Sequence, residues 1–172
     1  MDTRKVLWIE DNADNDLYHL TSPVYIDGRF QLDIATNASE AYYYLNKRGY
    51  DVIIVDIRIP PGKDPQWQTK HDVLMRNKHA NSNRLGLELL RSIFDENEEQ
   101  PSLQIDQNMK PERYGVFTVE RHEELESDLT RLNLHTLKYR RKNAMMPHTA
   151  LLDFITEVSD SPFGRENGYS QN

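Results

Sequence analysis

The stretches KVLWIED, residues 5–11, and VIIVD, residues 52–56, are two apolar runs that each end in acidic side chains. Short continuous apolar runs of this kind predict buried β-strands. If the two strands are parallel neighbours, Glu10, Asp11 and Asp56 meet at one edge of the sheet. Three carboxylates in one place form a site for a hard cation, and they offer a potential nucleophile.

The composition predicts a single cytoplasmic domain. The chain has 172 residues, 37% of them hydrophobic, and no cysteine, which excludes disulfides and thiolate metal sites. Residues 1–30 do not resemble a secretory signal, and no apolar run reaches about 18 residues, so we expect neither export nor a membrane span. The formal net charge of −7 argues against direct DNA binding.

Apolar runs alternate along the chain with segments of helical spacing, which is typical of βαβ units around a parallel sheet. After the first strand, Ala13, Leu17 and Leu20 share a helical face, and we expect Pro23 to end that helix. Asn37 and Glu40 predict a reciprocal N-cap pair. Further strands are expected at residues 30–34, 52–55, 114–119 and 135–139, and further helices at residues 38–45, 86–94, 125–132 and 147–158.

Residues 57–84 interrupt this alternation, because βα loops are typically about 2–6 residues long. The segment holds six cations and two acids, which makes it a basic lobe in an acidic protein: Arg58, Lys63, Lys70, Arg76, Lys78 and Arg84 against Asp64 and Asp72. Two interpretations remain open, a solvated insertion with a short helix at residues 71–77, and a partner-binding surface. We expect residues 95–112 to be an acidic loop.

Several positions in the right order resemble the receiver domain of two-component response regulators, the CheY-like family, over about residues 3–158. The acidic pair matches Glu10 and Asp11, and the phosphoacceptor matches Asp56. The loop IRIP and the helix GLELL resemble the family's D-x-x-M-P and G-x-E-L-L patterns. Thr118 matches the switch hydroxyl, and Lys142 matches the family's lysine, with Tyr139 three residues earlier like the switch aromatic.

The resemblance implies a flavodoxin-like doubly wound (βα)5 fold, with a five-stranded parallel sheet of order 2-1-3-4-5. It implies a receiver domain at residues 1–158, and the polar, charged composition of residues 159–172 predicts a flexible tail. In the implied site, Asp56 accepts the phosphoryl group with help from Thr118 and Lys142, and Thr118 and Tyr139 act as the switch. The implied cofactor is Mg²⁺, with these ligands: Glu10, Asp11, Asp56 and the backbone carbonyl of Arg58.

The implied function is that of a stand-alone response regulator. It would take a phosphoryl group from a histidine kinase or a histidine phosphotransfer protein and contact an unidentified downstream protein, without being an enzyme in the ordinary sense. The homodimer and the monomer both remain open. The alternative is an adaptor that binds a partner through residues 57–84 and a basic edge, without phosphorylation. A metal-dependent phosphatase or nuclease would need further acid-base or metal residues, which the sequence does not supply.

Each assignment has a structural alternative. Glu10 and Asp11 could cap a helix, Thr118 could be an ordinary strand residue, and Tyr139 could be a packed aromatic. The chain also departs from the family at Val119, where a small residue is usual, and at Asn143, where proline is usual. These departures predict narrower access to the site and a looser loop after Lys142.

Overall fold

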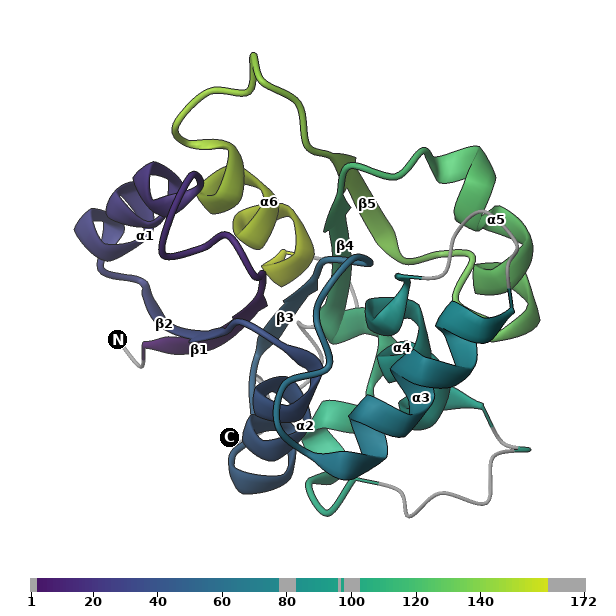
Figure 1. Ribbon diagram of the computed structural model, residues 1–172. Coiled ribbons are helices and arrows are strands. Elements are labelled where there is room, and N and C mark those ends of the chain that lie inside the picture. Colours follow the sequence, from purple (N-terminus) through teal and green to yellow (C-terminus); the bar gives the residue numbers. More distant parts are fainter. Residues whose placement is uncertain (1–2, 78–82, 96, 98–102, 161–172) are drawn as a thin grey trace.

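The computed structural model describes residues 3–77, 83–95, 97 and 103–160 (Figure 1). Five parallel strands form one sheet in the order β2-β1-β3-β4-β5. Their bounds are β1 (Arg4–Ile9), β2 (Phe30–Ala35), β3 (Val52–Val55), β4 (Tyr114–Thr118) and β5 (Lys138–Arg141). This confirms the predicted flavodoxin-like doubly wound α/β fold.

Helices cover both faces of the sheet (Figure 1). One face carries α1 (Thr21–Asp27) and α6 (Ala150–Ser159). The other carries α2 (Ala38–Lys47), α3 (Pro65–Arg76), α4 (Leu85–Phe94) and α5 (His122–Arg131). The described residues thus contain six α-helices where the sequence predicted five, together with the 3-10 turns η1 (Tyr18–Leu20), η2 (Asp106–Met109) and η3 (Pro111–Arg113).

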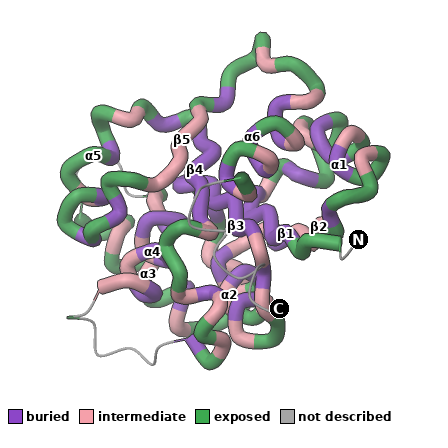
Figure 2. Tube along the Cα trace, turned by 180° about the vertical axis from the view of Figure 1, so that it is seen from behind, coloured by how far each residue is buried: buried purple, intermediate pink, exposed green. Residues whose placement is uncertain are grey.

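The central strands are buried because both faces are covered (Figure 2). All four residues of β3 are fully buried, as its continuous apolar run predicts. In β1, alternation sends Leu7 and Ile9 to the core under α2 and α4, and Val6 and Trp8 to the core under α1 and α6. The acidic residues that follow these strands are therefore carried by the most deeply buried part of the fold.

The first helix differs from its prediction. Ala13, Leu17 and Leu20 do pack against the core, but from turns and η1, and α1 begins only at Thr21. Pro23 lies in the first turn of α1, where a missing amide hydrogen costs no helical hydrogen bond, so it does not end the helix. The strand predicted at residues 135–139 is also displaced, to β5 at 138–141.

The helix α3 is longer than the predicted residues 71–77, and it is part of the core. Asp64 caps it by accepting a hydrogen bond from the Gln66 amide at 2.8 Å. Trp67 is fully buried and packs edge-on against Tyr42, with ring centroids 5.8 Å apart. This burial contradicts the interpretation of the whole segment 57–84 as a solvated insertion, although residues 78–82 lie outside the described part.

The loop before α3 is also fixed, because it caps α2. The carbonyls of Pro60 and Pro61 accept hydrogen bonds from the Ala38 and Ser39 amides at 2.9 and 3.1 Å. The Asn37 side chain accepts from the Glu40 amide at 2.9 Å, which confirms the predicted N-cap. The Glu40 carboxylate returns to the amide of Thr36 and not to that of Asn37.

The described part of residues 95–112 is more than a solvated loop. Asn108 is fully buried, and its amide nitrogen donates to the carbonyls of Leu45 and Arg48 at 2.7 and 2.8 Å. Its side-chain oxygen accepts from the Tyr50 amide at 2.9 Å. One side chain therefore satisfies the backbone groups that link the end of α2 to β3.

Trp67→Ala should lower the free energy of unfolding by about 3–5 kcal/mol, because it empties a buried aromatic site. Urea denaturation followed by circular dichroism would measure the change. Val73→Ala is the matched control on the same helix, because Val73 is half exposed, and it should change stability by no more than about 0.5 kcal/mol. Equal small effects from both variants would show that α3 is peripheral.

Candidate functional site

The carboxyl ends of four strands carry the predicted site residues to one edge of the sheet. Glu10 follows β1, Asp56 follows β3, Thr118 ends β4, and Lys142 follows β5. Backbone hydrogen bonds to a neighbouring strand hold the three residues that follow strands: the Glu10 amide donates to the Ala35 carbonyl, the Asp56 amide to that of Ile9, and the Lys142 amide to that of Thr118, at 2.9, 3.0 and 2.7 Å.

Three carboxylates meet at this edge, as the sequence predicts. One carboxylate oxygen from each of Glu10, Asp11 and Asp56 lies within 4.8 Å of the others. Glu10 and Asp56 are buried, and Asp11 is half-buried. Lys142 is also buried, and its Nζ donates to Asp56 Oδ2 at 2.7 Å and to Glu10 Oε2.

The electrostatics of the cluster follow from its burial. Burial and the nearby charge of Asp56 raise the pKa of Glu10 to about 7, although Lys142 acts in the opposite direction. For Lys142, burial would lower the pKa, but the charges of Asp56 and Glu10 raise it overall. The lysine therefore stays cationic and compensates two buried carboxyl groups.

The donor set fits a hard divalent cation. Carboxylate oxygens are the ligands that Mg²⁺ and Ca²⁺ prefer in proteins, and three of them converge here. A cation would also supply the positive charge that Lys142 alone divides between two carboxylates. Arg58 places its amide 3.4 Å from Asp56 Oδ1, so its backbone lies beside the cluster. The role of its carbonyl as a ligand stays a prediction.

The two predicted switch residues both contact the segment after β4. Thr118 is buried, and its hydroxyl accepts from the Glu120 amide at 3.4 Å. The Tyr139 hydroxyl donates to the Glu120 carbonyl, and its ring packs edge-on against His122 with centroids 5.0 Å apart. The structure thus brings Thr118 and Tyr139 to the backbone of the same residue, Glu120.

Sequence reasoning missed Glu120. Its side chain is 1% exposed, and it accepts from Arg58 Nε at 2.6 Å and from Arg84 Nη2 at 3.1 Å. Arg58 and Glu120 carry opposite charges shortly after neighbouring strands, a signal that could have linked them. Arg58 and Arg84 therefore do not extend the predicted basic lobe, because both guanidinium groups are turned to one buried acid.

The narrower access expected from Val119 stays a prediction, because Lys142 lines the nearby cavity but Glu10, Asp11 and Asp56 are not among its lining residues. A cavity of about 430 Å³ opens beside the cluster, and Asn12, Val119, Lys142, Asn143 and Met146 are among its lining residues. Val119 is 49% exposed, so it borders this opening without filling it. No helix in the described residues is long and apolar enough to span a membrane.

Comparisons with known proteins place the fold. No protein-family model and no curated protein matches the sequence. Among solved structures, a CheY-like receiver domain protein from Methanospirillum hungatei JF-1 is similar, with a TM-score of 0.58 and 17% identity over 92% of this chain and 95% of that one. Vibrio cholerae CheY4 is also similar, with a TM-score of 0.59 and 16% identity over 91% of this chain and 99% of that one.

A third similar structure is a response regulator protein from Burkholderia pseudomallei, described with a phosphorylated aspartic acid, a calcium ion and citrate. Its TM-score is 0.52, with 18% identity over 91% of this chain and 69% of that one. These likenesses cover nearly all of the chain at low identity. This chain therefore has the fold of response regulator receiver domains.

In metal-free buffer, Glu10 should make the fold less stable as the pH rises from about 4.5 to 7. The native state holds this proton up to a pKa of about 7 and the unfolded state releases it near 4.5, so the free energy of unfolding falls across this window. Urea denaturation at a series of pH values should show a smaller fall for Glu10→Gln. Glu126→Gln, on the exposed surface, is the control. An unchanged slope in Glu10→Gln would show that Glu10 is ionised throughout this range.

Proposed function

We propose that residues 1–158 are a single-domain response regulator receiver, which accepts a phosphoryl group on Asp56 from a histidine kinase or a histidine phosphotransfer protein. The observation that supports this proposal most directly is the buried ion pair of Lys142 with Asp56 at 2.7 Å. It lies inside a three-carboxylate cluster at the carboxyl edge of a receiver-type sheet. The domain would act in the cytoplasm, through contacts with a downstream protein.

The reaction needs a nucleophile and fixed positive charge. An oxygen of Asp56 would bond to phosphorus while the P–N bond of a phosphohistidine breaks, and the imidazole nitrogen would keep the bond electrons and take up a proton. Lys142 already donates to Asp56 Oδ2, so its charge would offset the charge on the phosphoryl oxygens. The Thr118 hydroxyl would donate to one of these oxygens.

The acidic cluster would serve as the metal site of this reaction. Glu10, Asp11, Asp56 and the Arg58 carbonyl would hold Mg²⁺, which would supply further positive charge at the transferred group. The fit rests on the oxygen-only donor set. The described Burkholderia structure, with its phosphorylated aspartic acid and calcium ion, is a precedent for this chemistry on the same fold.

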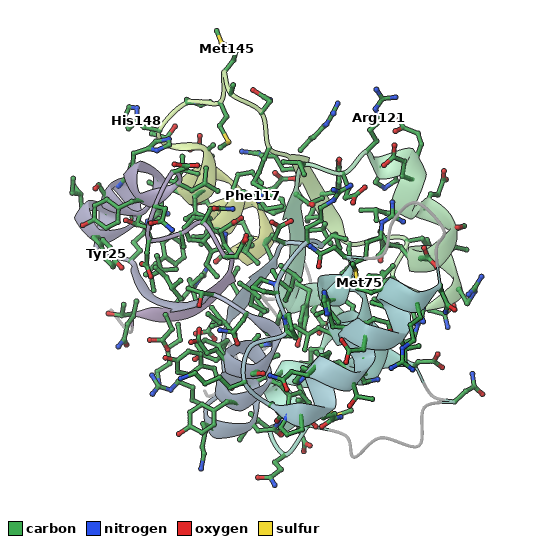
Figure 3. All side chains as sticks on the ribbon, viewed as in Figure 1. Tyr25, Met75, Phe117, Arg121, Met145 and His148 are labelled. Carbon is green, nitrogen blue, oxygen red and sulfur yellow. The ribbon has the colours of Figure 1, made fainter. Side chains whose placement is uncertain are left out.

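The phosphodonor would approach through the opening beside the cluster. The cavity reaches Lys142 from the side of Asn12 and Asn143. Met145, at the tip of the loop after β5, is 90% exposed and stands at the outer edge of the molecule with Arg121 (Figure 3). An exposed apolar side chain at the tip of the loop that follows Lys142 suits docking of another protein.

The signal would leave through Thr118 and Tyr139. Both contact Glu120 in the segment after β4, so a movement of Thr118 toward a phosphoryl oxygen would displace the acceptor of the Tyr139 hydroxyl. Tyr139 is half-buried, next to His122 at the start of α5. A change in its rotamer would therefore alter the surface formed by β5 and α5.

A phosphorylation-independent adaptor is the second candidate function. The helix α3 exposes two apolar side chains, Val73 and Met75, each about half exposed and on different sides of the helix (Figure 3 labels Met75). Such a pair on an additional helix could contact a partner without any change at Asp56. The two functions make opposite predictions for the phosphoacceptor variant.

Asp56→Asn should abolish the response to Mg²⁺ and beryllofluoride, a phosphoryl analogue that binds an aspartate. In the unaltered protein, amide NMR shifts should be saturable and should spread from Asp56 to Thr118 and Tyr139. Asp72→Asn is the matched control, because its side chain is 66% exposed on α3, and it should respond like the unaltered protein. A folded, unaltered protein that shows no shifts would favour the adaptor.

A further inference from the structure

Glu120 joins two separate segments of the site through its side chain. One carboxylate oxygen accepts from Arg58, in the loop after Asp56, and the other from Arg84, immediately before α4. Burial acts to raise the pKa of Glu120, but the hydrogen bonds from the two arginines hold it below its usual value. The carboxylate is therefore ionised, buried and shared by two cations.

The backbone of Glu120 is part of the same unit. Its amide donates to the Thr118 hydroxyl, and its carbonyl accepts from the Tyr139 hydroxyl. Any change that moves the Glu120 side chain therefore acts on both residues proposed as the switch. No role for this residue follows from the phosphoryl chemistry described above.

The two arginines differ in exposure. The Arg58 side chain is 49% exposed and its amide lies 3.4 Å from Asp56 Oδ1, so it is both free to move and close to the phosphoacceptor. The Arg84 side chain is only 12% exposed, and it also lies 3.8 Å from Glu124. Arg58 is thus the movable cation of the pair, and Arg84 the fixed one.

We propose that Arg58 and Glu120 form an electrostatic latch, in which Arg58 leaves Glu120 and binds the phosphoryl group when Asp56 is phosphorylated. This inference rests on the proposed function. Arg58 would be an anion-binding residue for the phosphorylated site, and Glu120 a positioning residue that holds Arg58 away from Asp56 in the resting protein.

The exchange is physically reasonable because of the charges at both ends. A phosphoryl group carries about −1.5 to −2 charges and several strong acceptor oxygens, and an arginine can bind two of them at once. Removing a cation from a buried carboxylate is usually unfavourable, because it leaves an uncompensated charge. Glu120 avoids this cost, since Arg84 remains bound to its other oxygen.

The exchange would also release the segment after β4. Without Arg58, the Glu120 side chain no longer ties this segment to the loop after β3. Its backbone, which accepts from Tyr139, is then free to follow Thr118 toward the phosphoryl group. The latch would therefore resist the switch in the resting state and favour it after phosphorylation.

The affinity for beryllofluoride, measured by NMR titration with Mg²⁺, should respond in opposite directions to the two partners. Arg58→Gln should weaken binding roughly tenfold, the size of one charge-assisted hydrogen bond. Glu120→Gln should strengthen it, because Arg58 is released beforehand. In the double variant the gain from Glu120→Gln should vanish, since Arg58 is no longer present to be released.

The Arg58 Nε resonance gives a direct readout of the exchange. It should shift on beryllofluoride addition in the unaltered protein, and should already be shifted in Glu120→Gln without the analogue. Arg113→Gln is the matched control, because Arg113 pairs with Asp51 at 3.1 Å near the start of β4, and it should leave the affinity unchanged. Thermal unfolding would check that each variant is folded.

The outcomes separate this inference from the proposed function. If the unaltered protein binds beryllofluoride at Asp56 but the two substitutions act independently, or the Arg58 resonance does not move, the latch is wrong and the receiver function stands. If the folded, unaltered protein does not bind the analogue, the proposed function is wrong and the latch fails with it.

Discussion

The site depends on the compensation of two buried carboxyl groups by Lys142. Glu10 and Asp56 end two central strands, where burial makes a negative charge unfavourable. Lys142 reaches both of them from the end of β5, across the end of β4. The ion pair therefore links the strands β1, β3 and β5, which lie far apart in the sequence. A metal or a phosphoryl group that enters this site must change how the charge of Lys142 is divided.

Much of the fold can be predicted from the sequence because the central strands are buried on both faces. The run at residues 52–55 has no polar residue, and all four side chains are buried, so pattern and structure agree. Prediction fails where one residue decides the outcome. Trp67 anchors α3 in a polar stretch, with only the partly buried Leu74 of the same helix beside it in the core, and Pro23 suits the start of a helix as well as its end. The spacing of apolar residues predicts neither the anchoring of α3 nor the position of Pro23 at the start of α1.

The candidate site can likewise be predicted from the sequence only in part. Glu10, Asp11 and Asp56 are predictable as neighbours because strand ends in a parallel sheet share one edge, and the structure brings them together. Glu120 is different, because an isolated acid in a loop carries no periodic signal. Its burial depends on two arginines that are remote in the sequence, Arg58 and Arg84. Which side chains of two loops form a pair depends on three-dimensional packing. A linear sequence pattern carries no information about that packing.

The capping of α2 by the Pro60 and Pro61 carbonyls makes the two sides of the site mechanically unequal. One side of the site is a single hydrogen-bonded and packed unit. It consists of α2, α3 and the loop that carries Pro60 and Pro61, and Trp67 anchors it in the core. The opposite side consists of the exposed loops after β4 and β5, which include Val119 and Met145. Strain produced at Asp56 would therefore be relieved on the side of β4 and β5, and a partner that distinguishes two states of this protein would have to bind there.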